Sequence, residues 1–396
     1  MNIVITNYYS ASNRGDAAIL EGVIAALDRQ IENASFDILT ENVKAAELIN
    51  GVSVHEQRIS PQKWKKWIKT GNISKALEGI DKELYERADL IVSTGGHHLT
   101  DTYFPAKLGM LLELAYCNRL DAPVALIGQT VGPLNDQPYR MLTRRVLNGV
   151  DLITVRDRRS LKVVNELQLT DVKTEFTADA AFAMTDAPIS EPPITRHRME
   201  DVPIADSSNQ LVTISVREVE EFYDTDTAER YYNSVAELAD FFITKKNAEV
   251  TFLSTCTGIA NYTKDDREVA HEVCSKMESR KASIVQGEYT PHELITICQQ
   301  ADLHVGTRMH SCILASKAGT PFVGIEYQYK VGELLNQFGM SEYGVEIGSM
   351  TTSSLLETCE KAFNQRGVLA ETMGARTHDL IDRSKENGRL AADLIS

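Results

Sequence analysis

Short apolar runs that lead into polar, glycine-containing turns recur along the chain. The first run occupies residues 3–5, and a polar turn separates it from a helical pattern of apolar residues that starts at Ala17. Further runs of this kind lie at residues 90–93, 124–127, 152–155, 211–216, 250–253, 301–305 and 321–325. Strands that alternate with helices predict mostly parallel sheets, in which ligands bind at the carboxyl ends of the strands.

A polar segment rich in proline divides this pattern into two halves. Pro188, Pro192, Pro193 and Pro203 lie among serine, aspartate and asparagine residues, which is typical of a linker. We therefore predict an α/β protein whose two Rossmann-like domains face a cleft, the usual place for a ligand. The predicted parts are an N-terminal domain at 1–187, a linker at 188–210, a C-terminal domain at 211–375 and a C-terminal helix at 376–396.

The charge balance limits the kinds of partner. The 396 residues include 41 Lys and Arg against 56 Asp and Glu, a formal net charge of −15. This argues against a nucleic-acid binder, whose affinity depends on neutralising phosphates, but it leaves room for local basic pockets that bind small anions. The six cysteines form no C-x-x-C pair, as in a reducing compartment. Because the chain shows no signal segment and no run of about 18 apolar residues, we expect a soluble, cytoplasmic protein.

The stretch Gly-Thr-Arg-Met-His-Ser at residues 306–311 lies where a predicted strand ends and a helix begins. A helix N-terminus offers free N–H groups to anions, and Arg308 adds a fork of donors that suits carboxylate or phosphate. His310 can transfer a proton near neutral pH, and Lys330 follows the next strand along the chain. In the alternative interpretation, His310 caps the helix and Arg308 pairs with a carboxylate. The second cation, on the adjacent strand, favours an anion site.

Two further strand ends carry arginine. Arg156 and Arg158 would share a face if their strand continued, whereas Asp157 would instead cap the start of a helix. Arg217 follows the first strand of the second half, where a surface ion pair with Glu218 explains the sequence about as well as ligand binding does.

Two glycine-containing loops of the first half carry no complete nucleotide or metal signature. The turn Asn-Arg-Gly-Asp at residues 13–16 lacks both the G-K-[ST] element of a P-loop and a G-x-G-x-x-G pattern. Residues 95–98, Gly-Gly-His-His, allow close approach of the backbone, but adjacent histidines alternate sides in an extended chain and do not form a metal pair unaided. We therefore predict no metal site.

Both tryptophans, Trp64 and Trp67, lie in one basic segment at residues 63–69. At helical spacing they share a face with Ile68, flanked by lysines. A basic, aromatic helix on an acidic protein indicates a contact with an anionic membrane surface. The alternative is an ordinary helix that packs its tryptophans against its own domain.

Taken together, these stretches resemble the polysaccharide pyruvyl transferase family, and within it the members of colanic-acid and amylovoran biosynthesis. The resemblance runs in order from residue 13 to residue 330. The matching stretches are residues 13–20 (NRGDAAIL), 128–133 (GQTVGP), 155–157 (VRD), 254–258 (STCTG), 264–267 (KDDR), 306–311 (GTRMHS) and 327–330 (YQYK).

The resemblance implies a glycosyltransferase-B-like fold and a transferase that moves the enolpyruvyl carbons of phosphoenolpyruvate onto a sugar as a pyruvate ketal. Phosphoenolpyruvate would be a co-substrate bound by the C-terminal domain, with no cofactor. By position, His310 and Arg308 match the family's Arg-x-His and are the catalytic candidates, with His310 as general acid. Arg156, Arg217 and Lys330 would supply cations for the carboxylate and phosphate.

The resemblance also assigns the sugar acceptor to the N-terminal domain. The acceptor would be linked to a polyprenyl-diphosphate carrier at the cytoplasmic membrane face, which suits a peripheral attachment through Trp64 and Trp67. The candidate residues for the acceptor side or for structural loops are Asn13, Gly15, Asp16, Gly95, Gly96 and Asp101. The Gly-Gly-His-His loop departs from the family pattern, whereas Asp101 keeps its acidic position.

Two other functions stay open. A glycosyltransferase of the same fold that uses a nucleotide-sugar donor would also need cations, although no diphosphate loop is evident. A non-catalytic protein of a polysaccharide locus would bind carrier-linked sugar without consuming phosphoenolpyruvate.

Overall fold

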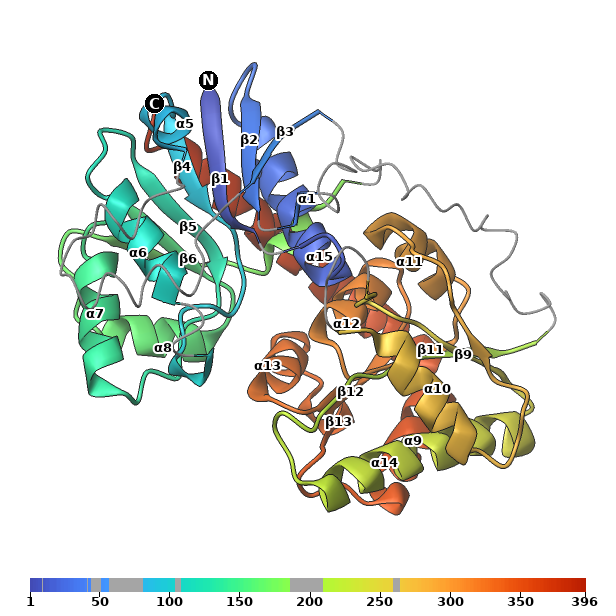
Figure 1. Ribbon diagram of the computed structural model, residues 1–396. Coiled ribbons are helices and arrows are strands. Elements are labelled where there is room, and N and C mark those ends of the chain that lie inside the picture. The colour runs from blue at the N-terminus through green and yellow to red at the C-terminus, as the bar shows by residue number, and fades with distance from the viewer. Residues whose placement is uncertain are drawn as a thin grey trace. The chain divides into compact units, whose positions relative to one another are not determined.

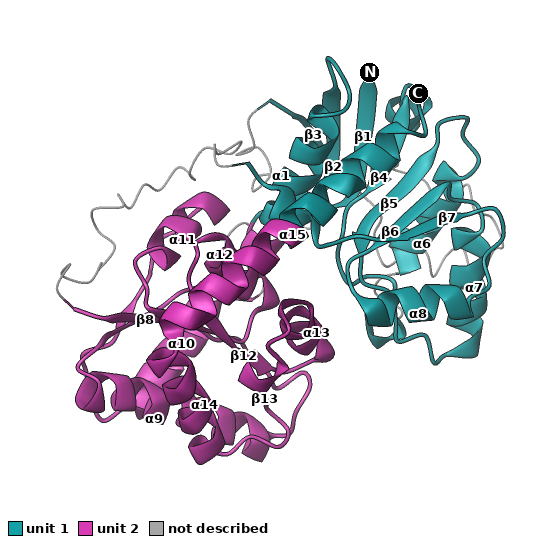
Figure 2. Ribbon diagram, turned by 180° about the vertical axis from the view of Figure 1, so that it is seen from behind, with its two compact units in different colours: residues 1–11, 16–185, 380–396 teal, residues 12–15, 186–379 magenta. Residues whose placement is uncertain are grey.

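The computed structural model describes residues 1–8, 10–40, 42–43, 51–56, 81–103, 108–185, 209–258 and 264–396 (Figure 1). Contacts divide the chain into two compact units, shown in different colours in Figure 2. Unit 1 comprises Met1–Ala11, Asp16–Thr185 and Leu380–Ser396, and unit 2 comprises Ser12–Gly15 and Asp186–Asp379.

Unit 1 is built on a parallel sheet of seven strands in the order β3-β2-β1-β4-β5-β6-β7. The strands are β1 (Asn2–Tyr8), β2 (Ser35–Thr40), β3 (Ser53–Glu56), β4 (Leu90–Ser93), β5 (Val124–Gln129), β6 (Leu152–Val155) and β7 (Lys173–Phe176). Among the described residues, the helices are α1 (Arg14–Asp28), α5 (Lys82–Glu86), α6 (Leu108–Cys117), α7 (Gln137–Leu147) and α8 (Arg158–Glu166), with short 3₁₀ turns η1 (Asp101–Tyr103) and η2 (Ala180–Ala183).

The central strands of unit 1 are buried on both faces. Ile3, Val4 and Ile5 of β1 have no exposed surface, and every residue of β5 and β6 is buried. On one face, α1 lies against the second half of α15 (Arg366–Ala392), since a Cβ at Gly388 would come within 2.0 Å of the backbone oxygen of Ala26. Helices α6 and α7 lie on the other face (Figures 1 and 2). Nearly continuous apolar strands are what a parallel sheet covered on both sides requires.

Unit 2 is built on a second parallel sheet, of six strands in the order β10-β9-β8-β11-β12-β13. The strands are β8 (Leu211–Ser215), β9 (Glu249–Phe252), β10 (Ser283–Ile284), β11 (Leu303–Gly306), β12 (Phe322–Glu326) and β13 (Gly344–Glu346). The described part of this unit contains the helices α9 (Thr225–Lys245), α10 (Asp266–Lys276), α11 (Pro291–Cys298), α12 (Met309–Lys317), α13 (Tyr329–Phe338), α14 (Thr352–Asn364) and the first part of α15, with the 3₁₀ turn η4 (Ser341–Tyr343).

Local capping signals explain where several helices of unit 2 begin and end. Thr290 and Glu293 form a capping box before α11, whose first residue is a proline. Asp224 caps α9 by accepting a hydrogen bond of 2.8 Å from the backbone N–H of Thr227. Helix α13 ends at Gly339, whose φ of 71° is in the left-handed region that glycine adopts without strain.

Both sheets have a topological switch point. In unit 2 the chain runs from β8 to β9 and β10 on one side, and then crosses to β11, β12 and β13 on the other. The equivalent point of unit 1 lies between β1 and β4. Ligands of such open sheets bind outside the carboxyl ends of the strands at the switch point. In unit 2 this is the region where β8 and β11 end.

The contacts assign two segments differently from the boundaries expected from the sequence. Residues 12–15 group with unit 2, although they precede almost all of unit 1 in the chain. Helix α15 is continuous from Arg366, and its residues from Leu380 onward group with unit 1. Local periodicity cannot reveal either assignment, because it does not show which distant segment a loop or a helix contacts.

In the described part of the chain, no helix combines the length and the apolar character needed to cross a membrane. The segment with Trp64 and Trp67 lies outside the described residues, as does most of the expected linker, residues 188–208.

Candidate functional site

The N-terminus of α12 lies at the switch point of unit 2. Strand β11 ends at Gly306, Arg308 occupies the N-cap position, and His310 is the second residue of the helix. An arginine side chain has no acceptor, and Arg308 makes no capping hydrogen bond to the first turn. The strand–helix junction expected from the sequence is therefore confirmed. The cationic Arg308 and the imidazole of His310 both lie at the helix N-terminus, which carries a partial positive charge.

Arg308 forms a largely buried ion pair with Asp266, the first residue of α10. Its Nη2 and Nε lie 2.5 Å and 3.2 Å from Asp266 Oδ1, and the two side chains are 15% and 1% exposed. The other carboxylate oxygen accepts hydrogen bonds from the backbone N–H groups of Thr255 and Cys256. Asp266 thus ties the loop after β9 to the loop after β11. The alternative interpretation of Arg308, pairing with a carboxylate, is therefore confirmed. A contact between Arg308 and a substrate stays a prediction.

A buried chain of hydrogen bonds supports this junction. His304 of β11 has no exposed surface; its Nδ1 lies 3.0 Å from Thr213 Oγ1 and its Nε2 lies 2.9 Å from Ser311 Oγ. Ser311 Oγ donates to the backbone oxygen of Arg308 at 2.7 Å. Because the Ser311 proton is used there, His304 donates from Nε2 and accepts at Nδ1, as a neutral imidazole does. Burial lowers the pKa of His304 to about 3, which agrees with the neutral form.

The stability of the protein should therefore depend on His304 in mild acid. The unfolded chain takes up a proton on this histidine near pH 6.5 and the folded chain only near pH 3, so the free energy of unfolding decreases as the pH drops below 6.5. The contribution lost by pH 5 is about 2 kcal/mol. Denaturant unfolding of the wild type and His304→Gln at several pH values measures it. The two curves should converge as the pH falls from 7 to 5, and parallel curves would contradict the neutral assignment.

The segment Ser12–Gly15 packs against His310. The backbone N–H of Arg14 donates to the Thr255 oxygen at 2.7 Å and so holds the segment to the loop after β9. A Cβ added to Gly15 would lie only 2.3 Å from Nδ1 of His310. The glycine therefore makes room for the imidazole in its observed position.

Asn13 shapes the same segment. It forms an isolated β-bridge with Cys256, and its side-chain oxygen accepts a hydrogen bond of 2.9 Å from the Gly15 N–H. The sequence placed Asn13 and Gly15 in a loop of the N-terminal domain, whereas the contacts place both beside the candidate catalytic histidine of unit 2. Asp16, in the first turn of α1, groups with unit 1. A role of these residues toward the acceptor stays a prediction.

Replacing Gly15 with alanine should impair turnover by displacing the imidazole. A shift of about 1 Å at a reacting group can cost up to about 10²-fold in rate, so we expect a loss of at least about tenfold in Gly15→Ala. The matched control is Gly374→Ala on α15, where a Cβ would meet nothing within 4 Å. Unchanged turnover in folded Gly15→Ala would show that the imidazole does not need its observed position.

Arg217 follows β8 and is 7% exposed. Its Nε donates to the backbone oxygen of Glu218 at 2.9 Å, and its guanidinium lies over the ring of Tyr327. The Glu218 carboxylate pairs instead with Lys264 at 2.5 Å. The alternative of a surface ion pair between Arg217 and Glu218 is therefore wrong, because the arginine is buried and the carboxylate is engaged elsewhere.

Lys330 follows the next strand along the same edge, in the first turn of the helix after it. Strand β12 pairs with β11 and ends at Glu326, and Lys330 is the second residue of α13. Burial, and then the neighbouring carboxylate of Glu346, raise the pKa of Glu326. Arg217, His310 and Lys330 thus follow the carboxyl ends of three adjacent strands, β8, β11 and β12.

In unit 1, Arg156 forms a buried ion pair. It is 4% exposed, its Nη1 lies 2.5 Å from Asp179 Oδ2, and its Nε donates to Thr130 Oγ1 at 2.7 Å. These contacts link the ends of β5 and β6 to the turn before η2. A role of Arg156 in phosphoenolpyruvate binding stays a prediction.

The strand before Arg156 ends at Val155. Asp157 caps α8, accepting a hydrogen bond of 2.7 Å from the backbone N–H of Ser160. The capping alternative is confirmed, and a shared strand face of Arg156 and Arg158 is wrong because the backbone turns into a helix at Asp157.

The loop after β4 follows the switch point of unit 1. A Cβ at Gly95 would lie 2.8 Å from the backbone of β5, and one at Gly96 would lie 2.5 Å from the ring of His98. Asp101 accepts a hydrogen bond of 2.8 Å from the backbone N–H of the residue that caps α7. The expected close approach of backbones is present at Gly95, whereas Gly96 meets the side chain of His98. A contact of this loop with the acceptor stays a prediction. Within the described ranges, no three His, Cys, Asp or Glu side chains are grouped as metal ligands.

Sequence reasoning missed three residues of the unit 2 site. Asp266 lies in the stretch Lys-Asp-Asp-Arg at 264–267, whose two acidic residues were a signal of a structural carboxylate at a helix start. Phe222 and Tyr327 contact Arg217. Tyr327 begins the matching stretch at 327–330, but nothing in the sequence pairs it with Phe222 or Arg217, because the two aromatic residues lie about a hundred positions apart.

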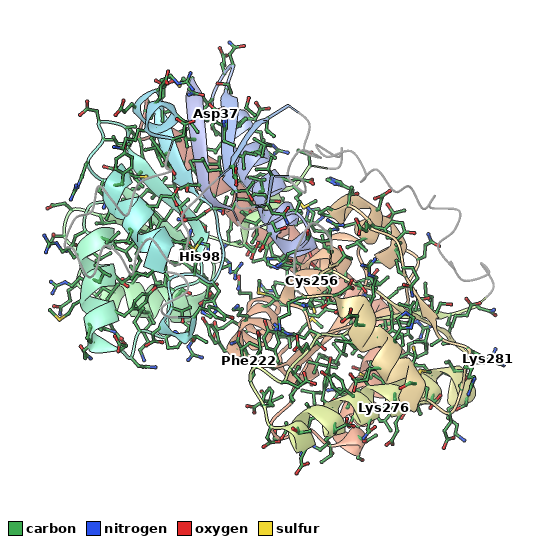
Figure 3. All side chains as sticks on the ribbon, in the orientation of Figure 1. Asp37, His98, Phe222, Cys256, Lys276 and Lys281 are labelled. Atoms are coloured by element: carbon green, nitrogen blue, oxygen red, sulfur yellow. The ribbon has the colours of Figure 1, made fainter. Side chains whose placement is uncertain are left out.

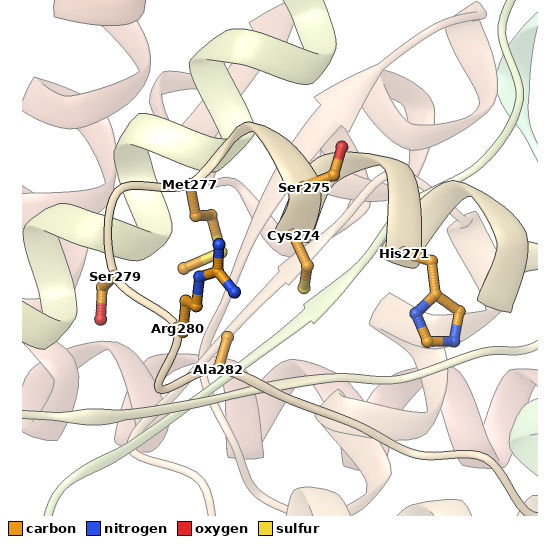
Figure 4. A pocket seen from close by; sticks show the side chains of 7 residues that line it. All are labelled: His271, Cys274, Ser275, Met277, Ser279, Arg280 and Ala282. Carbon is orange, nitrogen blue, oxygen red and sulfur yellow. The ribbon is translucent and has the colours of Figure 1, made fainter.

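A pocket of about 410 Å³ lies elsewhere in unit 2 (Figure 4). His271, Cys274 and Arg280 line part of it, at the C-terminal end of α10 and the loop that follows. A helix that connects two parallel strands runs antiparallel to them. The C-terminal end of α10 therefore lies at the opposite edge of the sheet from the candidate site.

The chain matches known proteins in sequence and in fold. The polysaccharide pyruvyl transferase family model matches residues 13–329. The amylovoran biosynthesis protein AmsJ of Erwinia amylovora is 26% identical over 385 residues, with 90% of each chain covered.

Similar folds occur in UDP-GlcNAc 2-epimerase from Neisseria meningitidis (TM-score 0.62, 14% identity, 98% of both chains) and sucrose-phosphate synthase from Thermosynechococcus elongatus (TM-score 0.60, 12% identity, 100% of this chain and 99% of the other). At these identities the structures show the fold alone, and the predicted pair of glycosyltransferase-B-like α/β domains is confirmed. Because the family model extends over most of the chain, from the Asn-Arg-Gly-Asp turn to the start of α13, this protein is a transferase that belongs to the polysaccharide pyruvyl transferase family.

Proposed function

We propose that the protein transfers the pyruvyl group of phosphoenolpyruvate to a sugar of an exopolysaccharide repeat unit, forming a pyruvate ketal and releasing phosphate. The observation that carries the proposal is the arrangement at one edge of the unit 2 sheet. Arg217, the α12 N-terminus with His310, and Lys330 follow three adjacent strand ends at a topological switch point. Phosphoenolpyruvate presents a carboxylate and a phosphate, and both are bound best by convergent cations and helix N–H groups.

The proposed chemistry needs one proton donor beside the anion site. His310 protonates the methylene carbon, and the positive charge that develops at C2 is met by a sugar hydroxyl. The C2–O bond to phosphate then breaks, and a second hydroxyl of the same sugar closes the ketal. The two sugar hydroxyls lose one proton each. One proton restores His310 after it has protonated the methylene carbon, and the other leaves with the phosphate, so the reaction is balanced.

The acceptor is proposed to be a lipid-linked oligosaccharide. The family match and the similarity to a protein named for amylovoran biosynthesis support a polysaccharide substrate. The basic segment with Trp64 and Trp67 would bring the enzyme to the cytoplasmic face of the membrane, where a polyprenyl-diphosphate carrier is found. Replacing the lysines of residues 63–69 with glutamine should weaken binding to vesicles that contain anionic lipid. Unchanged binding would favour tryptophans that pack on their own domain.

One alternative has a specific observation in its favour. The fold is similar to that of an epimerase whose structure was solved with UDP-GlcNAc, so a nucleotide-sugar donor is the second candidate. The two functions differ in their released product. Incubation with phosphoenolpyruvate and carrier-linked oligosaccharide should release phosphate and add one pyruvate ketal to the product mass. Release of UDP or GDP from a nucleotide sugar, without phosphate from phosphoenolpyruvate, would replace the proposal with a glycosyltransferase.

A further inference from the structure

The Arg217 guanidinium lies against two aromatic rings, and its ion pair with Glu221 is long at 3.9 Å. Its guanidinium carbon lies 3.9 Å from the centre of the Tyr327 ring and 5.0 Å from the centre of the Phe222 ring. The two rings are themselves 5.3 Å apart at an interplanar angle of 51°. Figure 3 labels Phe222, on the loop between β8 and α9. Distances of this size are those of cation–π contacts.

Such contacts leave the hydrogen-bonding edge of an arginine available. An aromatic ring attracts the positive charge of a guanidinium but offers no oxygen acceptor, so these contacts take up none of its N–H groups in conventional hydrogen bonds. One N–H, on Nε, donates to the backbone oxygen of Glu218. Among the described residues, neither Nη atom of Arg217 makes a hydrogen bond. The nearest carboxylate oxygen among them is Oε2 of the half-exposed Glu221, which lies 3.9 Å from Nη2. Arg308 differs, since it gives both Nε and Nη2 to Asp266.

The ring of Tyr327 is itself anchored. Tyr327 follows β12, and its backbone oxygen accepts a hydrogen bond of 3.1 Å from the hydroxyl of Tyr223. Tyr223 lies on the same loop as Phe222, and the backbone N–H groups of both donate to Val219 O. The loop after β8 is thereby fastened to the turn after β12, across the end of β11 that lies between these strands in the sheet.

We propose that Tyr327 and Phe222 are positioning residues that hold the Arg217 guanidinium with its two terminal nitrogens available to an anionic group of the donor substrate. This inference rests on the proposed function and deepens it. Of the two arginines that follow β8 and β11, it makes Arg217, rather than the carboxylate-paired Arg308, the one whose terminal nitrogens are available for a phosphate or carboxylate. It also explains why an arginine stands at this strand end, since a lysine ammonium has no plane that an aromatic neighbour could orient.

Binding of phosphoenolpyruvate by the purified full-length chain tests the inference. Tyr327→Leu removes the ring and should raise the dissociation constant about 5- to 30-fold. KM should rise with it, while kcat changes by less than threefold. Tyr327→Phe keeps the ring and should restore most of the affinity. The matched control is Phe241→Leu in the last turns of α9. It removes an aromatic ring whose centre lies 5.6 Å from Lys246 Nζ, away from the carboxyl ends of the strands, and should leave the affinity as in the wild type.

A double-mutant cycle separates positioning from a general effect on the fold. If Tyr327 acts through Arg217, Arg217→Ala with Tyr327→Leu should bind no more weakly than Arg217→Ala alone. Additive losses in the cycle, or wild-type affinity in Tyr327→Leu, would overturn the inference. Failure of the wild type to bind phosphoenolpyruvate would instead overturn the proposed function, so the two failures are distinguishable.

Discussion

Replacing His310 with alanine is expected to lower the turnover of phosphoenolpyruvate by about 10²-fold or more. The reason is that protonation of a carbon atom is difficult without a positioned acid, and His310 is the side chain at the strand–helix junction that can supply one. Because residue 15 is a glycine, the imidazole of His310 can pack against the segment Ser12–Gly15. Phosphate release at saturating donor and acceptor measures the effect.

Two further variants show whether His310 acts by proton transfer. His310→Gln keeps a polar side chain of similar reach but cannot act as the acid, so it should be as slow as the alanine variant. His378→Ala removes an exposed histidine from α15 and should turn over normally. Near-normal turnover in either His310 variant would remove this residue from the mechanism.

Replacing Asp266 with alanine is expected to lower the free energy of unfolding by about 3–5 kcal/mol, the typical cost of removing one partner of a buried ion pair. The carboxylate is 1% exposed, and without it Arg308 would keep a poorly solvated charge. The backbone N–H groups of Thr255 and Cys256 would also lose their acceptor. Unfolding in denaturant, followed by circular dichroism, measures the change.

An exposed ion pair provides the comparison. Glu342 pairs with Lys361, and the two side chains are 62% and 43% exposed. Glu342→Ala should therefore change the free energy of unfolding far less than Asp266→Ala does. If Asp266→Ala cost no more than this control, the pair with Arg308 would not hold the loops after β9 and β11 together. Activity of Asp266→Ala under folding conditions should fall as well, because Arg308 begins the helix that carries His310.

The fold was largely predictable because its elements are set by local patterns. Residues 3–5 lie within β1, and the run at 301–305 forms β11 from Leu303 onward; helices follow the carboxyl ends of both strands. Candidate residues at the strand ends were predictable for the same reason, since a parallel sheet collects those ends along one edge. His310 and Lys330 are examples: each is the second residue of a helix that follows a buried strand.

The partners of those residues could not be predicted in the same way. Nothing in the spacing shows that Arg308 is paired with Asp266, forty-two positions earlier, or that Arg156 is paired with Asp179. For Arg217, the sequence offered the adjacent Glu218 as a partner, and the structure supplies two aromatic rings instead. Charged side chains choose among all groups within reach in space, and neighbours in the chain have no special advantage once both lie on a folded surface.

The sequence by itself determined the alternation of strands and helices, the family to which the chain belongs, and the strand ends that carry cations and a histidine. Only the tertiary structure decided that Ser12–Gly15 packs beside His310, that Asp266 engages Arg308, and that Tyr327 and Phe222 hold Arg217. The physical reason is the range of the interactions. Periodicity and caps act within a few residues, whereas burial and ion pairing join segments brought together only when the sheet assembles.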